Sequence, residues 1–341
     1  IAARLQNGKV YLIGAGPGDT GLITMKGMEA LKEADVIVYD HLASPSLLNA
    51  TKDEAEWIDA SKFAGHHRMK QAEIEELLIE KAMKGQTVAR LKGGDPFIFG
   101  RGGEEALALK TAGIDYEVIP GVSSAYSAPA YAGIPITHRG KASSFHVITG
   151  HEDPTKENSS LDYEILAREE CTLAYLMGLS RLHQISERLI ANGKDAYTPA
   201  AVIASGTTAR QRCVTGELSS IAAISEKADI QPPAILVVGD VVNLNKEIDW
   251  QQAGPLSGKK ILVTATEIIA EPLAEKIRKL GGEPVVMSLI SVRAEKIYGL
   301  KEVLVRPGKR WLVFTSRNGV RFFFEQMKKE EIDIRSLGIC R

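Results

Sequence analysis

Short apolar runs alternate with amphipathic segments over the first third of the chain. Residues 10–13 and 36–39 are apolar runs typical of buried strands, and residues 88–91, Val-Ala-Arg-Leu, are expected to form another strand. Residues 22–34 and 71–84 carry the apolar spacing of helices. This order predicts a βαβ arrangement at the start of the chain. In such a sheet the carboxyl ends of neighbouring strands share one edge, where ligands bind.

A second α/β pattern begins after Pro120. Strands are expected over residues 145–149, 172–176, 200–204 and 234–238, with a helix over residues 180–192. A further strand from Cys213, with a turn at Gly216, indicates mixed rather than purely parallel sheets. The small residues over 121–133 are interpreted as a hinge between the two units.

A polar segment with Gly254 and Pro255 separates this pattern from the end of the chain and is typical of a linker. After it, residues 260–264 start another strand and helix pattern. We therefore expect α/β domains over residues 8–119 and 120–245, a linker over residues 246–258, and a partial third domain over residues 259–341.

Composition narrows the class of protein. The 341 residues, 44% hydrophobic and 25% charged, match a globular chain of two or three domains. A net charge of −1 predicts no general affinity for nucleic acid, and no apolar run is long enough to span a membrane. Cys171, Cys213 and Cys340 form no Cys-x-x-Cys pair, which favours packing roles in a reducing compartment. Without a leader pattern, the cytoplasm is the expected location.

The densest glycine cluster covers residues 91–105, which hold five glycines. Because glycine costs conformational entropy on folding, this density indicates backbone at positive φ or close to a ligand. Asp95 would then fix a polar group of that ligand. A mobile surface loop ahead of a helix near Gly103 is the alternative interpretation.

Another glycine cluster, Gly-Ala-Gly-Pro-Gly-Asp at residues 14–19, follows the first expected strand. It lacks the spacing of a dinucleotide fingerprint. Pro17 has no N–H to offer a pyrophosphate, and Asp19 would repel one. The sequence therefore argues against a phosphate cradle and against a nicotinamide oxidoreductase.

Five motifs occur in one order, namely residues 14–19, Tyr39-Asp40, Gly93-Gly94-Asp95-Pro96, residues 120–125 and residues 133–139. On these motifs, and on the continuation of the Asp95 loop through Glu105, residues 8–245 resemble the tetrapyrrole methylases, most closely the members that methylate uroporphyrinogen III. The resemblance implies two α/β domains with mixed sheets, an active-site cleft between the domains, and a homodimer.

The resemblance also implies the reaction and its cofactor. S-adenosyl-methionine would be the co-substrate, and methylation of uroporphyrinogen III at C2 and C7 would give precorrin-2 and S-adenosyl-homocysteine on the routes to siroheme and cobalamin. By position, the cofactor contacts fall on Pro17, Gly93, Gly94, Asp95, Ile98, Ser123, Ser124, Met177 and Gly206. A sulfonium ion suits carbonyls, a carboxylate and soft apolar surface. Taken alone, Met177 would be a core residue.

The proton acceptor and donor of the family fall on Asp40 and Lys62. Without the resemblance, Asp40 at a strand end would be a capping residue and Lys62 a surface lysine. The substrate carries eight carboxylates, so cations are expected in the cleft. Five cations near the shared motifs are candidates, and Arg90 and Arg139 are ranked ahead of Lys92, Arg101 and His138. His66 and His67 lack convincing ligand spacing, so no metal site is expected.

Some positions depart from the pattern of the family. Arginine and glycine are common where this chain has His41 and Ser61, arginine is common at Phe63, and Glu-Asn-Gly-Thr is common where residues 204–207 are Ala-Ser-Gly-Thr. The departures at His41, Ser61 and Phe63 concern substrate contacts. The departure in residues 204–207 removes a carboxylate near the cofactor.

The chain from Gly258 onward resembles the start of uroporphyrinogen-III synthases, through residues 261–264 and 311–320. Only about a third of such a domain is present, and Ala265 stands where the family often has arginine. Synthase activity does not follow from these residues. A fusion of this kind would place an enzyme that makes uroporphyrinogen III beside one that consumes it.

Three alternatives stay open from the sequence. A sister methylase would act on a later precorrin, whereas a nucleic-acid methyltransferase would need a basic surface that the net charge does not indicate. A regulatory module that binds an adenine ligand without turnover would not need Asp40 or Lys62.

Overall fold

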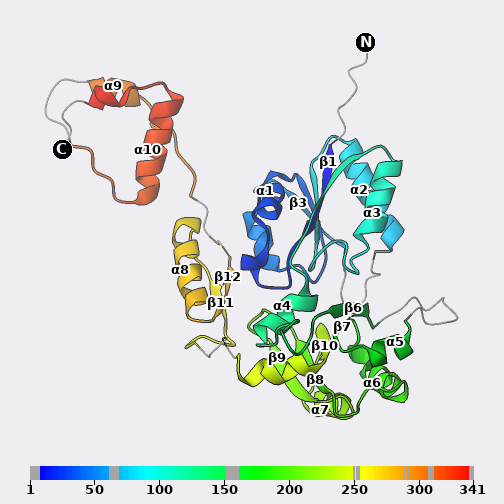
Figure 1. The fold of residues 1–341 in the computed structure, drawn as a ribbon. Coiled ribbons are helices and arrows are strands. Elements are labelled where there is room, and N and C mark those ends of the chain that lie inside the picture. Colours follow the sequence, from blue (N-terminus) through cyan, green and yellow to red (C-terminus); the bar gives the residue numbers. More distant parts are fainter. Residues whose placement is uncertain are drawn as a thin grey trace.

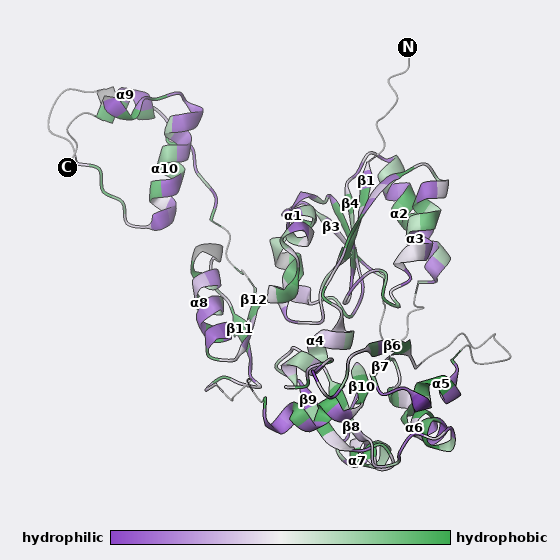
Figure 2. Ribbon diagram, in the orientation of Figure 1, coloured by the Kyte–Doolittle hydropathy of each residue, from purple (hydrophilic) through white to green (hydrophobic). Residues whose placement is uncertain are grey.

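The computed structural model describes residues 8–60, 69–150, 161–248, 250, 254–287, 289, 292–305 and 311–337. Two α/β units, each built on a five-stranded sheet, lie one above the other, and the C-terminal part lies beside them (Figure 1). The strands of the sheets are largely hydrophobic, and hydrophilic residues gather on the helices around them (Figure 2).

The first sheet contains β1 (Lys9–Gly14), β2 (Val36–Tyr39), β3 (Glu56–Asp59), β4 (Val88–Lys92) and β5 (Asp115–Ile119). Its order is β3-β2-β4-β1-β5, and every neighbouring pair is parallel. The expectation of mixed sheets therefore does not hold for this sheet. Its connections are helical crossovers, which join parallel strands.

Helices cover both faces of the first sheet, namely α1 (Met25–Glu33), α2 (Gln71–Met83) and α3 (Gly102–Thr111). Because side chains alternate along a strand, Val10 and Leu12 pack under α2 and α3, whereas Ile13 packs under α1. The sheet is thus buried on both faces, as its apolar strands predict.

The second sheet contains β6 (Phe145–Thr149), β7 (Thr172–Leu176), β8 (Pro199–Ala204), β9 (Arg212–Glu217) and β10 (Ala234–Val238). Its order is β6-β7-β10-β8-β9, with β6 and β7 parallel and the other pairs antiparallel. This sheet is mixed, as the sequence predicts. The predicted turn at Gly216 is wrong, because Gly216 lies inside β9 and pairs with Ala200 of β8.

The helices of the second unit are α4 (Ser124–Tyr131), α5 (Tyr163–Arg168), α6 (Leu182–Ala191) and α7 (Ile221–Lys227). The segment interpreted as a hinge contains α4, whose N-cap Ser123 accepts a hydrogen bond from the N–H of Ala125. Ala128 and Ala132 pack with Ala201 of β8. The small residues thus allow close packing of a helix on a sheet, rather than bending of the chain.

The C-terminal part contains β11 (Lys260–Val263), α8 (Glu267–Lys279), β12 (Glu283–Val286), α9 (Leu300–Val305) and α10 (Arg317–Lys329). Short 3-10 segments are η1 (Thr20–Leu22), η2 (Pro45–Ala50), η3 (Leu179–Arg181), η4 (Asp240–Lys246) and η5 (Ile334–Leu337). β11 and β12 form a parallel pair, and Glu283 accepts a hydrogen bond from the N–H of Ala209 at 2.9 Å. The domain boundaries given above stay a prediction.

Candidate functional site

Three loops meet at the carboxyl edge of the first sheet. The loops after β1 and β4 exchange backbone hydrogen bonds between Gly16 and Gly94, with N···O distances of 3.2 Å and 2.7 Å. The loop after β5 lies against both, since a Cβ on Gly121 would stand 2.2 Å from the Gly94 carbonyl oxygen and 2.7 Å from the Gly14 Cα. Glycine is required here because the backbones touch.

Asp95 joins two of these loops. One carboxylate oxygen accepts a hydrogen bond from the N–H of Phe97 at 2.8 Å, and the other accepts from the N–H of Gly121 at 3.0 Å. A carboxylate has about four acceptor positions, so further lone pairs stay available for a ligand. The cofactor contact expected of Asp95 stays a prediction.

The loop after β1 also reaches the second unit. The N–H of Asp19 donates to the Thr207 hydroxyl at 3.1 Å, and the Tyr131 hydroxyl donates to the Asp19 carboxylate at 2.9 Å. Burial, and then the neighbouring Asp19, raise the pKa of Tyr131. These contacts bring Pro17 of the first unit and Gly206 of the second to one junction.

Strained backbone follows β7 and β8. Met177, Ser205 and Thr207 have φ of 56°, 47° and 68°, values that side chains rarely adopt. Met177 is also 49% exposed, so it is not a core residue. Strain held by the surrounding structure is found at ligand clamps. Met177 is itself an expected cofactor contact, and Ser205 and Thr207 flank another, Gly206.

The remaining expected cofactor contacts lie on the same loops. Ser123 caps α4, and a Cβ on Gly94 would approach the Ser124 nitrogen at 4.0 Å. Gly93 lies against Leu42 of the loop after β2, and Ile98 is exposed in the glycine-rich loop. The structure therefore places these residues at the junction of the two units, although their role in binding stays a prediction.

Four side chains form two ion pairs on each carboxylate below this edge and are here called the charge cluster: the buried Arg90, Lys92 and Glu105 and the partly exposed Asp40. Arg90 and Lys92 lie on β4 and are each 2% exposed. Arg90 donates to the Asp40 carboxylate at 2.6 Å and to Glu105 at 3.0 Å, and Lys92 donates to Glu105 at 2.9 Å. The Asp40 carboxylate faces these cations, and among the described residues no backbone N–H is a partner of it, as a cap would require.

Burial acts differently on the two cations of the charge cluster. Burial opposes the charge of Arg90, but the carboxylates of Asp40 and Glu105 outweigh it and raise the pKa of Arg90. For Lys92, burial and then the neighbouring Arg90 lower its pKa. Buried charges persist only where they are paired, so the four residues depend on one another.

Sequence reasoning missed the part played by Glu105. Arg90 and Lys92 alternate with Ala89 and Leu91 in a strand that is buried along its whole length. Two cations on one face of such a strand require anions nearby. The spacing of Arg90 and Lys92 was therefore the sequence signal that a buried carboxylate lies nearby.

Two other cations expected near the site, Arg139 and Arg101, lie on the surface. Arg139 is exposed in the turn that the His138–Ala142 bridge closes, and Arg101 forms a surface ion pair with Glu104 at 2.6 Å. Six residues singled out in the sequence lie outside the described residues: Lys62, the expected proton donor, Ser61, Phe63, His66, His67 and Cys340. The substrate-binding roles of Arg90 and Arg139 stay predictions.

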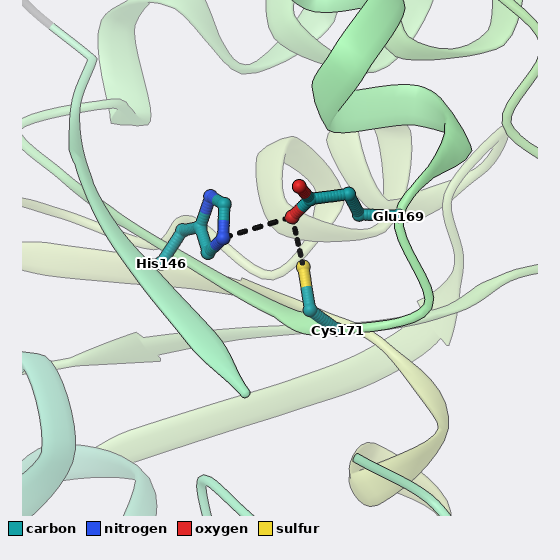
Figure 3. Close-up of side chains that lie close together, drawn as sticks. All are labelled: His146, Glu169 and Cys171. Carbon is teal, nitrogen blue, oxygen red and sulfur yellow. Dashed lines mark hydrogen bonds and ion pairs between the residues drawn. The ribbon is translucent and has the colours of Figure 1, made fainter. Parts of the chain in front are cut away.

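A separate cluster of His146, Glu169 and Cys171 lies at the amino ends of β6 and β7 (Figure 3). One Glu169 carboxylate oxygen lies 2.8 Å from the His146 ring nitrogen and 3.7 Å from the Cys171 sulfur. Burial, and then Glu169, raise the pKa of Cys171 to about 11, and burial raises that of Cys213 to about 11. Both cysteines are thus protonated packing residues at neutral pH. The expected absence of a metal stays a prediction.

In the part of the chain that the structure describes, no helix has the length and apolar character needed to cross a bilayer.

Two family models match the chain. Residues 9–222 match the Tetrapyrrole (Corrin/Porphyrin) Methylases, and residues 271–341 match Uroporphyrinogen-III synthase HemD. The chain is 46% identical over 334 residues to the uroporphyrinogen-III C-methyltransferase of Bacillus subtilis (strain 168), a match that covers 98% of this chain and 68% of that protein.

Two further relatives match about seven tenths of the chain. The S-adenosyl-L-methionine-dependent uroporphyrinogen III methyltransferase of Methanosarcina barkeri is 51% identical over 247 residues, which are 72% of this chain and 97% of that protein. The crystal structure of uroporphyrin-III C-methyltransferase from Thermus thermophilus with S-adenosyl homocysteine is similar at 38% identity and a TM-score of 0.60, covering 70% of this chain and 100% of that one.

Proposed function

Because this chain belongs to the tetrapyrrole methylases, we propose that it transfers methyl groups from S-adenosyl-methionine to carbon atoms of uroporphyrinogen III. The observation that carries the proposal is the junction of two glycine-rich loops with the strained residues after β7 and β8, beside the base candidate Asp40. Methylation at C2 and C7 would give precorrin-2 for siroheme and cobalamin, and the chain would act as a homodimer.

The cofactor site draws on both units. Pro17, Gly93, Gly94, Asp95 and Ile98 would contact it from the first unit, and Ser123, Ser124, Met177 and Gly206 from the second. The fit to a sulfonium ion rests on the free lone pairs of Asp95 and on the exposed, strained Met177. When bound, this co-substrate supplies an electrophilic methyl group.

The transfer needs alignment and a base. The electron pair of a pyrrole carbon forms the new carbon–carbon bond while the methyl–sulfur bond breaks and leaves its pair on sulfur. The macrocycle then carries a positive charge and loses a proton. Holding the two reactants in line supplies most of the acceleration.

Asp40 is the residue that would accept this proton. It follows β2 at the carboxyl edge, and its side chain is 30% exposed, so part of it stays open to a substrate while it pairs with the charge cluster. The hydrogen bond from Arg90 at 2.6 Å fixes its direction. Lys62 would be the proton donor, as the family resemblance implies.

The substrate is a flat macrocycle with carboxylates around its edge. Phe97, Ile98 and Phe99 are exposed side by side in the glycine-rich loop and offer apolar surface to a face of a ring. Arg139 is exposed and would pair with substrate carboxylates. Arg90 would reach one only beside Asp40, because its guanidinium is buried.

A methylase of a later precorrin is the second candidate, since it would share the cofactor site. The identities of 46% and 51% to enzymes named for uroporphyrinogen III favour that substrate. The match of residues 271–341 to a uroporphyrinogen-III synthase model favours it independently. We assign no synthase activity to this part of the chain.

The test compares the wild-type chain with Asp40→Asn. Methyl transfer from labelled S-adenosyl-methionine to uroporphyrinogen III should fall about 100-fold to 10,000-fold, the range of a lost general base, while S-adenosyl-homocysteine still binds. Transfer by the variant at the wild-type rate would remove Asp40 from the mechanism. Efficient transfer by the wild type to a later precorrin alone would support the second candidate.

A further inference from the structure

One carboxylate of the charge cluster has no part in the chemistry given above. Glu105 is 0% exposed, so it cannot touch a substrate in the cleft. It lies in the first turn of α3, directly after the glycine-rich loop. Its neighbour Glu104 is exposed and pairs with Arg101 on the surface.

This inference rests on the proposed function. We propose that Glu105 is a positioning residue for the base Asp40, and that it acts by balancing the charges of Arg90 and Lys92. In its absence both cations would direct their full charge at Asp40, the one remaining anion of the cluster.

The contacts give each cation two carboxylates. One oxygen of Glu105 accepts from Arg90 Nε at 3.0 Å and from Lys92 Nζ at 2.9 Å. Arg90 also donates through Nη2 to Asp40 Oδ1 at 2.6 Å, and Lys92 Nζ lies 4.0 Å from Asp40 Oδ2. Glu105 thus reaches Asp40 only through these two cations.

The second oxygen of Glu105 supports a role through charge. Glu105 Oε2 is buried and has no hydrogen-bond partner among the described residues. A buried, unpaired carboxylate oxygen is costly, and a buried ion cluster contributes little to stability compared with apolar packing. Because the cluster adds little to stability, the negative charge of Glu105 is the property that matters for the site. With two cations and two carboxylates, the net charge of the cluster is zero.

Replacing Glu105 with glutamine keeps the size of the side chain and leaves the cluster with an excess positive charge. Asp40 would then hold a transferred proton less readily, and its carboxylate would be drawn further toward the cations. We expect kcat of Glu105→Gln to fall about 10-fold to 100-fold, less than for loss of the base itself. The affinity for S-adenosyl-homocysteine should change less than about twofold, because the cofactor site is untouched.

The chain offers a matched control one residue away. Glu104→Gln makes the same chemical change on the same helix, but at a surface ion pair, and should leave kcat unchanged. A fall in kcat for both variants alike would point to a general effect on α3 and would overturn the proposal.

A rescue separates charge balance from mere structure. The double variant Glu105→Gln with Lys92→Met removes one anion and one cation, so that Asp40 and Arg90 stay as a neutral pair. We expect it to recover at least about fivefold of the lost kcat, a coupling typical of residues in one network. If Glu105 only held the structure together, loss of a second contact would lower kcat further, and that result would overturn the proposal.

Two further measurements test the proposal if a variant does not fold or if the wild type shows no activity. Should Glu105→Gln fail to fold, Glu105→Asp keeps the charge and must retain kcat within about tenfold of the wild type, while the folded double variant is measured as above. Should the wild type make no methylated product, the proposed function fails. The unfolding midpoints of the same variants then test the charge balance, which requires a higher midpoint for the double variant than for Glu105→Gln.

Discussion

The Tyr131 hydroxyl donates a hydrogen bond to the Asp19 carboxylate at 2.9 Å, and so joins α4 of the second unit to the glycine-rich loop after β1. Asp19 is also held through its N–H by Thr207. The two units are therefore connected at the junction where the cofactor is expected. A cofactor that contacts both units would gain from this connection, because the two hydrogen bonds restrain the units before it binds.

Removal of the Tyr131 hydroxyl tests this connection. Tyr131→Phe leaves the half-buried Asp19 without this donor, and we expect the Kd for S-adenosyl-homocysteine to rise about 5-fold to 10-fold, which corresponds to about 1 kcal/mol. Titration calorimetry measures this change. The exposed Tyr197 provides the control, since Tyr197→Phe should leave the Kd unchanged. Equal affinity of the two variants would show that the connection does not support binding.

The contact between glycine backbones predicts a large effect of one methyl group. In Gly121→Ala the new Cβ would lie 2.2 Å from the Gly94 carbonyl oxygen, so the loops must separate. We expect a loss of about 2 kcal/mol or more in unfolding free energy, the cost of overpacking, together with loss of cofactor binding. Urea titration measures the first effect.

Gly103→Ala is the matched control for that variant. Apart from its chain neighbours and the backbone of its own helix α3, no described atom lies within 4 Å of a Cβ at Gly103. Alanine should raise the unfolding free energy there by about 0.5–1 kcal/mol, because it is the better helix former. If both alanine variants behaved alike, the close approach of the loops would not be the reason for glycine at position 121.

The backbone strain at Met177 predicts opposite effects on stability and binding. Met177→Gly should relieve a φ of 56° and raise the unfolding free energy by up to about 1 kcal/mol, but it removes the exposed side chain and should weaken cofactor binding. Asp229, with a φ of 48°, is the control. Asp229→Gly should stabilise the chain without any change in cofactor affinity. Unchanged binding by Met177→Gly would separate the strain from the cofactor.

A pH dependence follows from Glu117 of β5. Hydrogen bonds from Lys26, and then from Lys9, lower the pKa of Glu117 to about 2 from an ordinary value of 4.5. Because the pKa is lower in the folded chain, this carboxylate stabilises the fold above pH 4.5 and loses its effect as the pH falls toward 2. The ion pairs are partly exposed, so the effect at neutral pH should stay below about 1 kcal/mol.

Glu117→Gln tests this dependence. The difference in unfolding free energy between the variant and the wild type should be present at neutral pH and shrink on acidification below pH 4.5. Glu29→Gln, on the exposed face of α1, serves as the control. A difference that stayed constant down to pH 3 would contradict the lowered pKa.

The strands were the most predictable part of the fold. β2, β6, β7 and β10 have the bounds that their apolar runs predict. The edge strand β3 has the sequence Glu-Trp-Ile-Asp and escaped prediction, because an edge strand with polar ends carries little periodic signal. The helix α4 was interpreted as a hinge, since its small residues and Pro129 resemble loop composition.

The candidate site residues were assigned from the order of five motifs along the chain, more than from hydrophobic periodicity or charge. The glycine loops after β1 and β4 indicate a ligand edge on their own, because both follow strands of one parallel sheet. The strand of Arg90 indicates burial, but the identity of its anionic partners was not predictable, since Asp40 and Glu105 come from other elements. Contacts of this kind depend on tertiary packing.

Anaerobic turnover of the purified chain with S-adenosyl-methionine and uroporphyrinogen III is the direct test of the proposed methyl transfer, with the product analysed by mass and absorbance. We expect two methyl groups on each macrocycle and two equivalents of S-adenosyl-homocysteine. Binding of the cofactor without methyl transfer to this substrate would contradict the proposed function.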